Sequence, residues 1–223
     1  VNVATVSGAE SITGGADNDT ITLSGALAGT ESINLGAGSD TLILANAANT
    51  GTVSNVETLL GGTDADTITV ATLISKGLIS LGNGADTLNL GDYANVATIS
   101  DVETIVGGSA ADTLTLGSAL GASNSIDLGA GNDKLTLGDF TNTGSLSNVE
   151  SLVGGSGADT ITFATQLSNG SVNLGGGNDS VTLGDFANTA TVSSVESMLG
   201  GSDADTITIS TQLVDGVIDL GSG

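Results

Sequence analysis

Nine aspartates each stand directly before a short strand-like run that alternates mostly between polar and aliphatic residues. Glycine-rich stretches precede most of them, as in GGTDADTITV (residues 61–70) and SLGNGADTLNL (residues 80–90). Carboxylates and the backbone carbonyls of such turns are the oxygen ligands that the hard cation Ca²⁺ prefers. The candidate calcium ligands are Asp19, Asp40, Asp66, Asp86, Asp112, Asp133, Asp159, Asp179 and Asp205.

The composition excludes many other kinds of chemistry. The 25 acidic residues face only 2 lysines and no arginine, which gives a formal net charge of −23, and histidine and cysteine are absent. Zinc, haem and iron–sulfur sites would lack their usual ligands. Nucleic acid is not an expected partner, because binding its backbone requires lysine and arginine. We also expect no enzyme, since the acidic residues are nearly all repeated and have no histidine or arginine beside them.

A long internal repeat organises these aspartates. Glycine pairs recur at steps of 46 or 47 residues, and glutamates keep the same steps, so that the long units start near residues 10, 57, 103, 150 and 196. A periodicity of this length is typical of solenoids and repeat arrays. We interpret residues 1–223 as a single repeat domain. The repeated glutamates are Glu10, Glu57, Glu103, Glu150 and Glu196.

Each long unit consists of two related halves, which predicts a coil of roughly 23 residues and about nine coils. Residues 66–70 (DTITV) alternate between polar and aliphatic side chains, the pattern of a strand with one buried face. Short strands joined by Gly-Asp-Asn turns at a fixed period predict an all-β fold, a right-handed parallel β-solenoid. The second apolar runs at 71–75 and 97–100 leave open whether a coil has two strands or three.

Stacked coils would stack the aspartate turns into one file. Neighbouring carboxylates at strand spacing repel each other by about 1 kcal/mol even in a water-like dielectric, so a divalent cation between coils is favoured. Glycine permits left-handed backbone and lets carbonyl oxygens point toward a cation. The glycines expected to contribute are Gly15, Gly36, Gly38, Gly62, Gly82, Gly84, Gly108, Gly129, Gly131, Gly155, Gly157, Gly175, Gly177 and Gly201.

These turns resemble the RTX nonapeptide GGxGxDxUx of secreted bacterial calcium-binding proteins. The residues that carry the resemblance are LGAGNDKL (128–135), GGGND (175–179) and GGSGAD (154–159), together with the lead-in NVESL (148–152). The resemblance implies calcium ions between successive turns, bound by aspartate and backbone carbonyls, and thus up to about eight ions. It also implies export in an unfolded state and folding in extracellular calcium. In most turns one glycine of the nonapeptide is replaced.

Two further repeated features have alternative interpretations. Asp92, Asp139 and Asp185 each precede an aromatic residue and could form a second metal column. The alternative, which we favour, is that the aromatic side chains fill a wider corner while asparagines form ladders along the stack. Threonine pairs could build an ice-binding outer face, although the array is interrupted. The threonine pairs are Thr20/Thr22, Thr67/Thr69, Thr113/Thr115, Thr160/Thr162 and Thr206/Thr208, and the interrupting residues are Ile43, Asn89 and Lys134.

We therefore expect a secreted, calcium-stabilised structural module of a bacterial cell surface, such as a surface layer, adhesin stalk, filament or matrix. An ice- or glycan-binding module is the alternative. The expected partners are calcium ions and neighbouring repeats or copies of the same protein, with a cell-surface glycan as the alternative partner. No stretch is apolar for long enough to span a membrane. The chain begins and ends inside its repeat, which suggests a segment of a longer protein or a stacked unit.

Overall fold

The structure, a computed structural model, describes residues 1–212 and 216–223. The chain divides into two compact units, Val1–Asp112 and Thr113–Gly223, and each is described by itself. Within the described residues all regular secondary structure is β-strand, and no helix is long and apolar enough to cross a membrane. The parallel strands stack as a β-solenoid, which confirms the predicted fold class.

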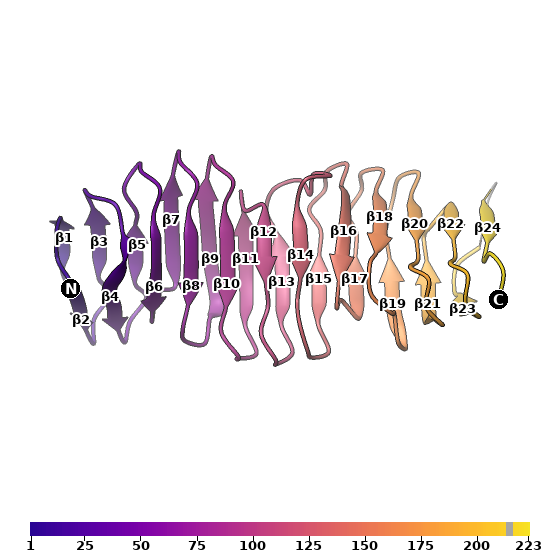
Figure 1. Ribbon diagram of the computed structural model, residues 1–223, viewed down its shortest axis with the longest axis horizontal. Helices are drawn as coiled ribbons and strands as arrows, with labels where there is room; N and C mark the ends of the chain where they lie inside the picture. The colour runs from indigo at the N-terminus through magenta and orange to yellow at the C-terminus, as the bar shows by residue number, and fades with distance from the viewer. Residues whose placement is uncertain (213–215) are drawn as a thin grey trace. The chain divides into compact units, whose positions relative to one another are not determined.

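In the first unit the strands alternate between two parallel sheets (Figure 1). Odd-numbered strands form one sheet and even-numbered strands form the other, each in chain order. The strands are β1 (Val3–Val6), β2 (Ser11–Gly15), β3 (Thr20–Leu23), β4 (Ala28–Gly36), β5 (Thr41–Ile43), β6 (Thr50–Ser54), β7 (Thr58–Gly62), β8 (Thr67–Val70), β9 (Ser75–Gly82), β10 (Thr87–Leu90), β11 (Val96–Ser100) and β12 (Thr104–Val106).

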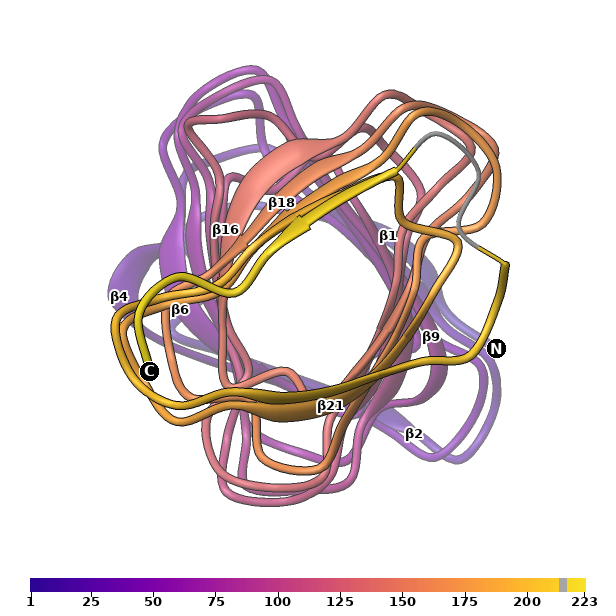
Figure 2. The same ribbon diagram turned by 90° about the vertical axis from the view of Figure 1, so that its right-hand side faces the viewer.

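The second unit repeats this arrangement, with β16 and β18 on one side of its coil and β21 on the opposite side (Figure 2). The strands in its described part are β13 (Thr113–Leu116), β14 (Ser125–Asp127), β15 (Lys134–Thr136), β16 (Thr143–Ser147), β17 (Ser151–Val153), β18 (Thr160–Phe163), β19 (Gly170–Asn173), β20 (Ser180–Thr182), β21 (Thr189–Ser193), β22 (Ser197–Leu199), β23 (Thr206–Ile209) and β24 (Val217–Asp219).

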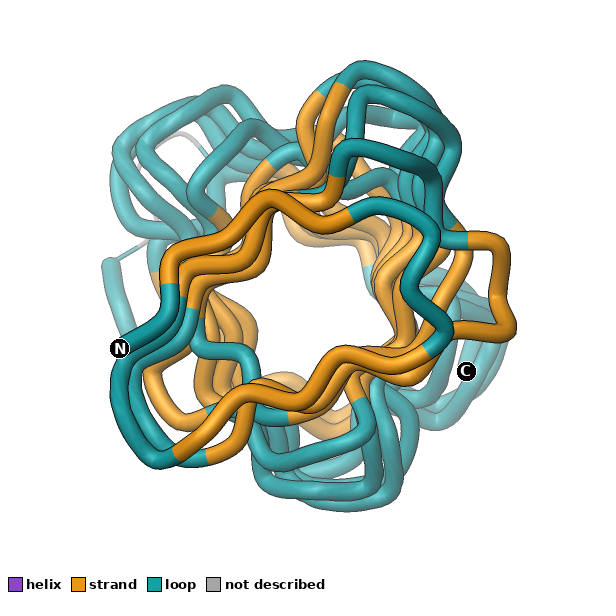
Figure 3. Tube along the Cα trace, turned by 90° about the vertical axis from the view of Figure 1, so that its left-hand side faces the viewer, coloured by secondary structure: helices purple, strands orange, loops and turns teal. Residues whose placement is uncertain are grey.

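The core of each unit lies between its two sheets. Alternate residues of a strand point to opposite faces, so Ile68 and Val70 of β8 are buried while Thr67 and Thr69 face outward. The same alternation buries Ile161 and Phe163 of β18. In Figure 3, which looks at the first unit from its N-terminal end, strands surround this core and most of the turns lie at the outer edges. The turns are therefore where residues can meet solvent and cations.

The coil is shorter than the predicted length of about 23 residues. Equivalent residues in successive coils are separated by 17, 20 or 21 positions, and each coil contains two strands. The solenoid accordingly has about 11 turns rather than nine. The reason is that the long repeat contains five strands instead of four. Asp19 precedes the odd-numbered strand β3, whereas the equivalent Asp66 precedes the even-numbered strand β8.

Candidate metal sites

The predicted single file of aspartates is wrong, because five strands make two and a half coils. In the first unit, Asp19 and Asp40 precede strands of the odd-numbered sheet, whereas Asp66 and Asp86 precede strands of the even-numbered sheet. The two pairs therefore lie at opposite edges of this unit. In the second unit, Asp133 and Asp205 likewise precede odd-numbered strands, and Asp159 and Asp179 precede even-numbered strands. Asp112 is the last residue of the first unit.

A hydrogen-bonded ladder positions the aspartates within each edge. The backbone N–H of Leu27 donates to Oδ1 of Asn49 (3.0 Å), and the N–H of Asn49 donates to Oδ1 of Asp66 (2.9 Å). The N–H of Asp66 then donates to Oδ1 of Asp86 (2.7 Å), and the N–H of Asp86 to Oε2 of Glu103 (2.8 Å). Each rung joins one coil to the next. An Asn-Asp-Asp-Glu series thus runs along the edge.

The second unit contains the same ladder. It leads from Leu120 through Asn142, Asp159 and Asp179 to Glu196, with donor–acceptor distances of 3.0, 3.0, 2.8 and 2.7 Å. In the odd-numbered edge of the first unit, the N–H groups of Asn2, Asp19 and Asp40 donate to Asp19, Asp40 and Glu57, respectively. The repeated glutamates were not among the predicted site residues. Their constant 17-residue distance after the second aspartate could have revealed them.

Each ladder uses only one oxygen of an aspartate. The second carboxylate oxygen, Oδ2, is buried and has no hydrogen-bond partner at Asp40, Asp66, Asp86, Asp159, Asp179 and Asp205. All nine aspartates are buried except Asp205, which is half-buried. A buried carboxylate oxygen without a partner is costly unless a cation neutralises it. The two lysines of the chain are too few to do so.

Glycines allow the aspartate turns of neighbouring coils to approach closely. Gly82 has a φ of 96° and Gly84 a φ of 153°, both in the region that favours glycine. A side chain on Gly82 would collide with the carbonyl oxygen of Gly62, and one on Gly84 would approach the carbonyl oxygen of Asp64 (2.9 Å). Backbone carbonyls of one turn thus lie against the next turn.

The other predicted glycines occupy equivalent positions. Positive φ angles occur at Gly36, Gly38, Gly129, Gly131, Gly175 and Gly177. The carbonyl oxygens of Gly15, Gly155 and Gly201 face the next coil at Gly36, Gly175 and Gly221, while Gly108 and Gly157 pack against backbone atoms of the preceding coil. Most of the glycine positions expected from the sequence therefore lie against the backbone of a neighbouring coil.

Side chains alone do not complete a metal site. Among the residues that the structure describes, no three acidic side chains converge closely enough to hold a metal ion. Calcium takes six to eight oxygen ligands and accepts backbone carbonyls readily. A buried Oδ2 beside close-packed turn carbonyls fits this preference, because the carbonyls supply the ligands that the carboxylates lack.

The electrostatics of the ladder favour a bound cation. Burial raises the pKa of Asp86, and the nearby carboxylates of Asp66 and Glu103 raise it further. Burial and the two flanking carboxylates raise the pKa of Asp179 in the same way. Burial also raises the pKa of Asp112. The folded chain therefore disfavours the charged form of these carboxylates unless a counter-charge is bound.

The raised pKa values predict how stability depends on pH in the absence of calcium. The folded chain binds protons at Asp86 and Asp179 more tightly than the unfolded chain does, so stability should fall as pH rises through their folded pKa values. Asp19, whose pKa is lowered by the backbone N–H of Asn2, opposes this trend at one position. We expect the β-sheet circular dichroism signal of resin-decalcified protein to increase as the pH is lowered from neutral toward the ordinary aspartate pKa of 3.8.

Saturating calcium should reverse this dependence, because protons then compete with the metal for the same carboxylates. The same pH series with calcium therefore serves as the control. A β-sheet signal of the decalcified protein that increases with pH over this interval would contradict the unfavourable burial of these carboxylates.

The second set of aspartates is placed differently. Asp92, Asp139 and Asp185 are exposed, and Oδ1 of Asp185 accepts a hydrogen bond from the N–H of Ser202 in the next coil (2.9 Å). We interpret them as caps of the following turn rather than as a metal column. The expected asparagine ladder is confirmed.

The aromatic side chains were expected to fill a wider corner of the core, and this prediction is wrong. Tyr93, Phe140 and Phe186 are 45%, 42% and 39% exposed. A side chain on Gly138 would meet the ring of Phe140 at 2.6 Å, so the ring lies over the glycine of its own turn. The aromatic rings therefore lie at the outside of their turns rather than in the core.

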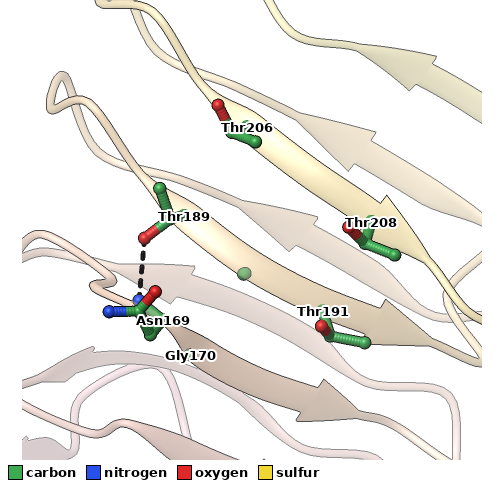
Figure 4. Close-up of a pocket in the computed structure, with 7 residues that line it drawn as sticks. Asn169, Gly170, Thr189, Thr191, Thr206 and Thr208 are labelled. Atoms are coloured by element: carbon green, nitrogen blue, oxygen red, sulfur yellow. Dashed lines mark hydrogen bonds between the residues drawn. The ribbon is translucent and has the colours of Figure 1, made fainter.

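The outer threonines form a shallow groove in the second unit (Figure 4). It has a volume of about 290 Å³ and is lined by Asn169, Gly170, Thr189, Ala190, Thr191, Thr206 and Thr208. The N–H of Asn169 donates to Oγ1 of Thr189 (2.8 Å). The predicted interruptions of the threonine array are confirmed, since Ile43, Asn89 and Lys134 pair directly with Thr22, Thr69 and Thr113.

Comparison with known proteins agrees with the turn geometry. The family model of the RTX calcium-binding nonapeptide repeat matches the chain in four copies, at residues 5–42, 100–135, 118–143 and 147–162. Together these matches cover somewhat less than half of the chain. No curated protein and no solved structure matches the chain significantly. The matched stretches, which contain buried aspartates and close glycine turns, are therefore similar to the RTX calcium-binding nonapeptide repeat.

Proposed function

We propose that this chain is a calcium-stabilised structural module in which ions bind between successive aspartate turns. In the described units the sites are the Asp19–Asp40, Asp66–Asp86 and Asp159–Asp179 steps. The carboxylates and the turn carbonyls would hold each ion, which would supply the positive charge that joins adjacent coils. The main support for this proposal is the partnerless Oδ2 of Asp40, Asp66, Asp86, Asp159 and Asp179. Oδ2 of Asp19 accepts a hydrogen bond from the N–H of Gly15 (3.2 Å).

Calcium stoichiometry tests the proposal directly. We expect equilibrium dialysis or native mass spectrometry to find at least three ions per chain, and a protein that binds none would overturn it. Asp86→Asn keeps the shape and the Oδ1 acceptor but removes the charge, so this variant should lose one ion. Asp92→Asn, which changes an exposed carboxylate, is the matched control and should retain every ion.

We also propose that the module works outside the cell. Without bound cations, the net charge of −23 would oppose folding where calcium is scarce. This is the behaviour of a protein that is exported unfolded and folds in extracellular calcium. We therefore infer a secreted structural element of a bacterial cell surface that contacts neighbouring repeats or copies, rather than an enzyme. The repetition of nearly all acidic residues, without arginine or histidine beside them, is what supports this assignment.

Ice or glycan binding by the outer threonines is less well supported. An ice-binding face requires a flat, regular array, whereas here Ile43, Asn89 and Lys134 interrupt the threonine columns. The groove in the second unit contains hydroxyl groups but no charged side chain. Threonine is, in addition, a common residue on the outer face of a strand.

A further inference from the structure

Buried asparagines in the ladders are surrounded by the kinds of oxygen atoms that bind a metal ion, although the asparagines are not metal ligands themselves. Asn49, Asn95, Asn142 and Asn188 are fully buried at the turn that precedes the first aspartate of each ladder. We propose that their side-chain amides replace calcium at these turns, so that the coils they join hold together without metal. This inference rests on the proposed calcium sites and specifies which coils contain them.

The geometry around Asn49 carries the argument. Its Nδ2 donates to the carbonyl oxygens of Ala45 (3.0 Å) and Ala47 (2.6 Å), and to Oδ1 of Asp66 in the next coil (2.8 Å). One nitrogen is thus surrounded by two turn carbonyls and a carboxylate. Calcium takes the same kinds of oxygen ligands. Here the hydrogen atoms of the amide satisfy these oxygens instead.

The arrangement is repeated at every such turn. Nδ2 of Asn142 donates to the carbonyls of Gly138 (3.2 Å) and Phe140 (3.0 Å) and to Oδ1 of Asp159 (2.9 Å). The amide oxygen of Asn142 accepts from the N–H of Leu120 (3.0 Å), so both ends of the amide are used. Asn95 and Asn188 have the equivalent partners, at distances between 2.8 and 3.2 Å.

The aspartate turns lack this donor. Asp66 stands four residues after Gly62 and two after Asp64, as Asn49 stands after Ala45 and Ala47. Oδ1 of Asp66 accepts from the N–H of Asn49, as Oδ1 of Asn49 accepts from the N–H of Leu27, so Oδ2 of Asp66 corresponds to the amide nitrogen. It has no hydrogen to donate and is buried without a partner. Exchange of NH₂ for O therefore turns a satisfied turn into one that requires a cation. Calcium is confined to the aspartate steps, and the asparagine steps exclude it.

Asn142→Asp tests this inference, because the two side chains have the same shape. We expect the variant to bind one calcium ion more than the wild-type chain, measured by equilibrium dialysis or native mass spectrometry. It should also need a higher calcium concentration for half-maximal folding, measured by circular dichroism. Asn49→Asp offers an independent test in the first unit. Asn169→Asp, at an exposed residue of the second unit, adds the same charge and should bind no additional ion.

Each outcome decides between the proposals. An unchanged ion count in Asn142→Asp and Asn49→Asp, or failure of both to fold in saturating calcium, would overturn the asparagine inference alone. A wild-type chain that binds no calcium would overturn the proposed function instead. An additional ion in Asn169→Asp would also count against the inference, because the gain would then follow from charge rather than from the position in the ladder.

Discussion

Removal of calcium is expected to convert the β-sheet circular dichroism signal of this chain to that of a random coil at neutral pH. Three sites, each at a calcium concentration about a hundredfold above its Kd, would together stabilise the folded state by about 8 kcal/mol. Domains of this kind are stable by roughly 5–15 kcal/mol in total. Loss of the ions would therefore remove most of the stability, and the buried carboxylates would then destabilise the coils.

A chelator titration followed by addition of calcium measures this effect and its reversibility. Magnesium is the control, because it is smaller, requires a stricter geometry and gives up its water reluctantly, so it should not restore the fold. A β-sheet signal that stays unchanged in excess chelator would contradict an essential role of the metal. A signal restored equally by magnesium would indicate charge screening in place of specific sites.

Gly82→Ala is expected to destabilise the chain by on the order of 3–4 kcal/mol, even in saturating calcium. The φ of 96° at Gly82 is strained for any residue with a side chain, and the new methyl group would collide with the carbonyl oxygen of Gly62. Relief of this collision would move a carbonyl that packs between two aspartate turns. Urea unfolding in calcium gives the change in the free energy of unfolding.

Gly15→Ala is the matched control for this substitution. Gly15 lies in the same kind of turn, but its φ is not in the positive region and a side chain there would meet no atom within 4 Å. It should change the free energy of unfolding by less than about 1 kcal/mol. Equal effects of the two substitutions would show that general loss of glycine flexibility, rather than close packing of the turns, controls stability.

The sequence predicts the fold because strand alternation and turn residues agree in every repeat. The threonine–isoleucine alternation of residues 67–70 specifies a strand with one buried face, and the glycines beside Asp66 and Asp86 specify the turns. The repeated Asn49 also indicates a ladder, which the structure confirms with hydrogen bonds to Asp66. These features are local, so that a single sequence is sufficient to reveal them.

The coil length is not predicted in the same way, because it depends on how many strands share one repeat. The connection that contains Glu57 joins two strands without a glycine-rich turn, so the coil boundary there has no obvious mark. Residues 71–74 look like an apolar strand but form the turn before β9. Each error shifts the strand count by one. With an odd number of strands in each long repeat, equivalent aspartates of successive repeats lie at opposite edges. No local pattern of side chains shows this.

The exposed position of the aromatic rings is a second case in which the sequence was insufficient. Phe140 and Phe163 are both phenylalanines within the same repeat pattern, yet Phe163 is 1% exposed and Phe140 is 42% exposed. Phe163 ends a strand whose alternate residues face the core, whereas Phe140 follows Gly138 in a short turn. The difference arises from backbone direction, which the residue type does not specify.

The odd number of strands in each repeat has a mechanical consequence. Since the aspartate pairs of the first unit lie at opposite edges, ions that bind there tighten both sides of the unit. Metal ions restricted to one edge would shorten that side alone and bend the stack as calcium came and went. Alternation between the edges balances the tension, so that a change in calcium concentration loosens or stiffens this unit without making it curl.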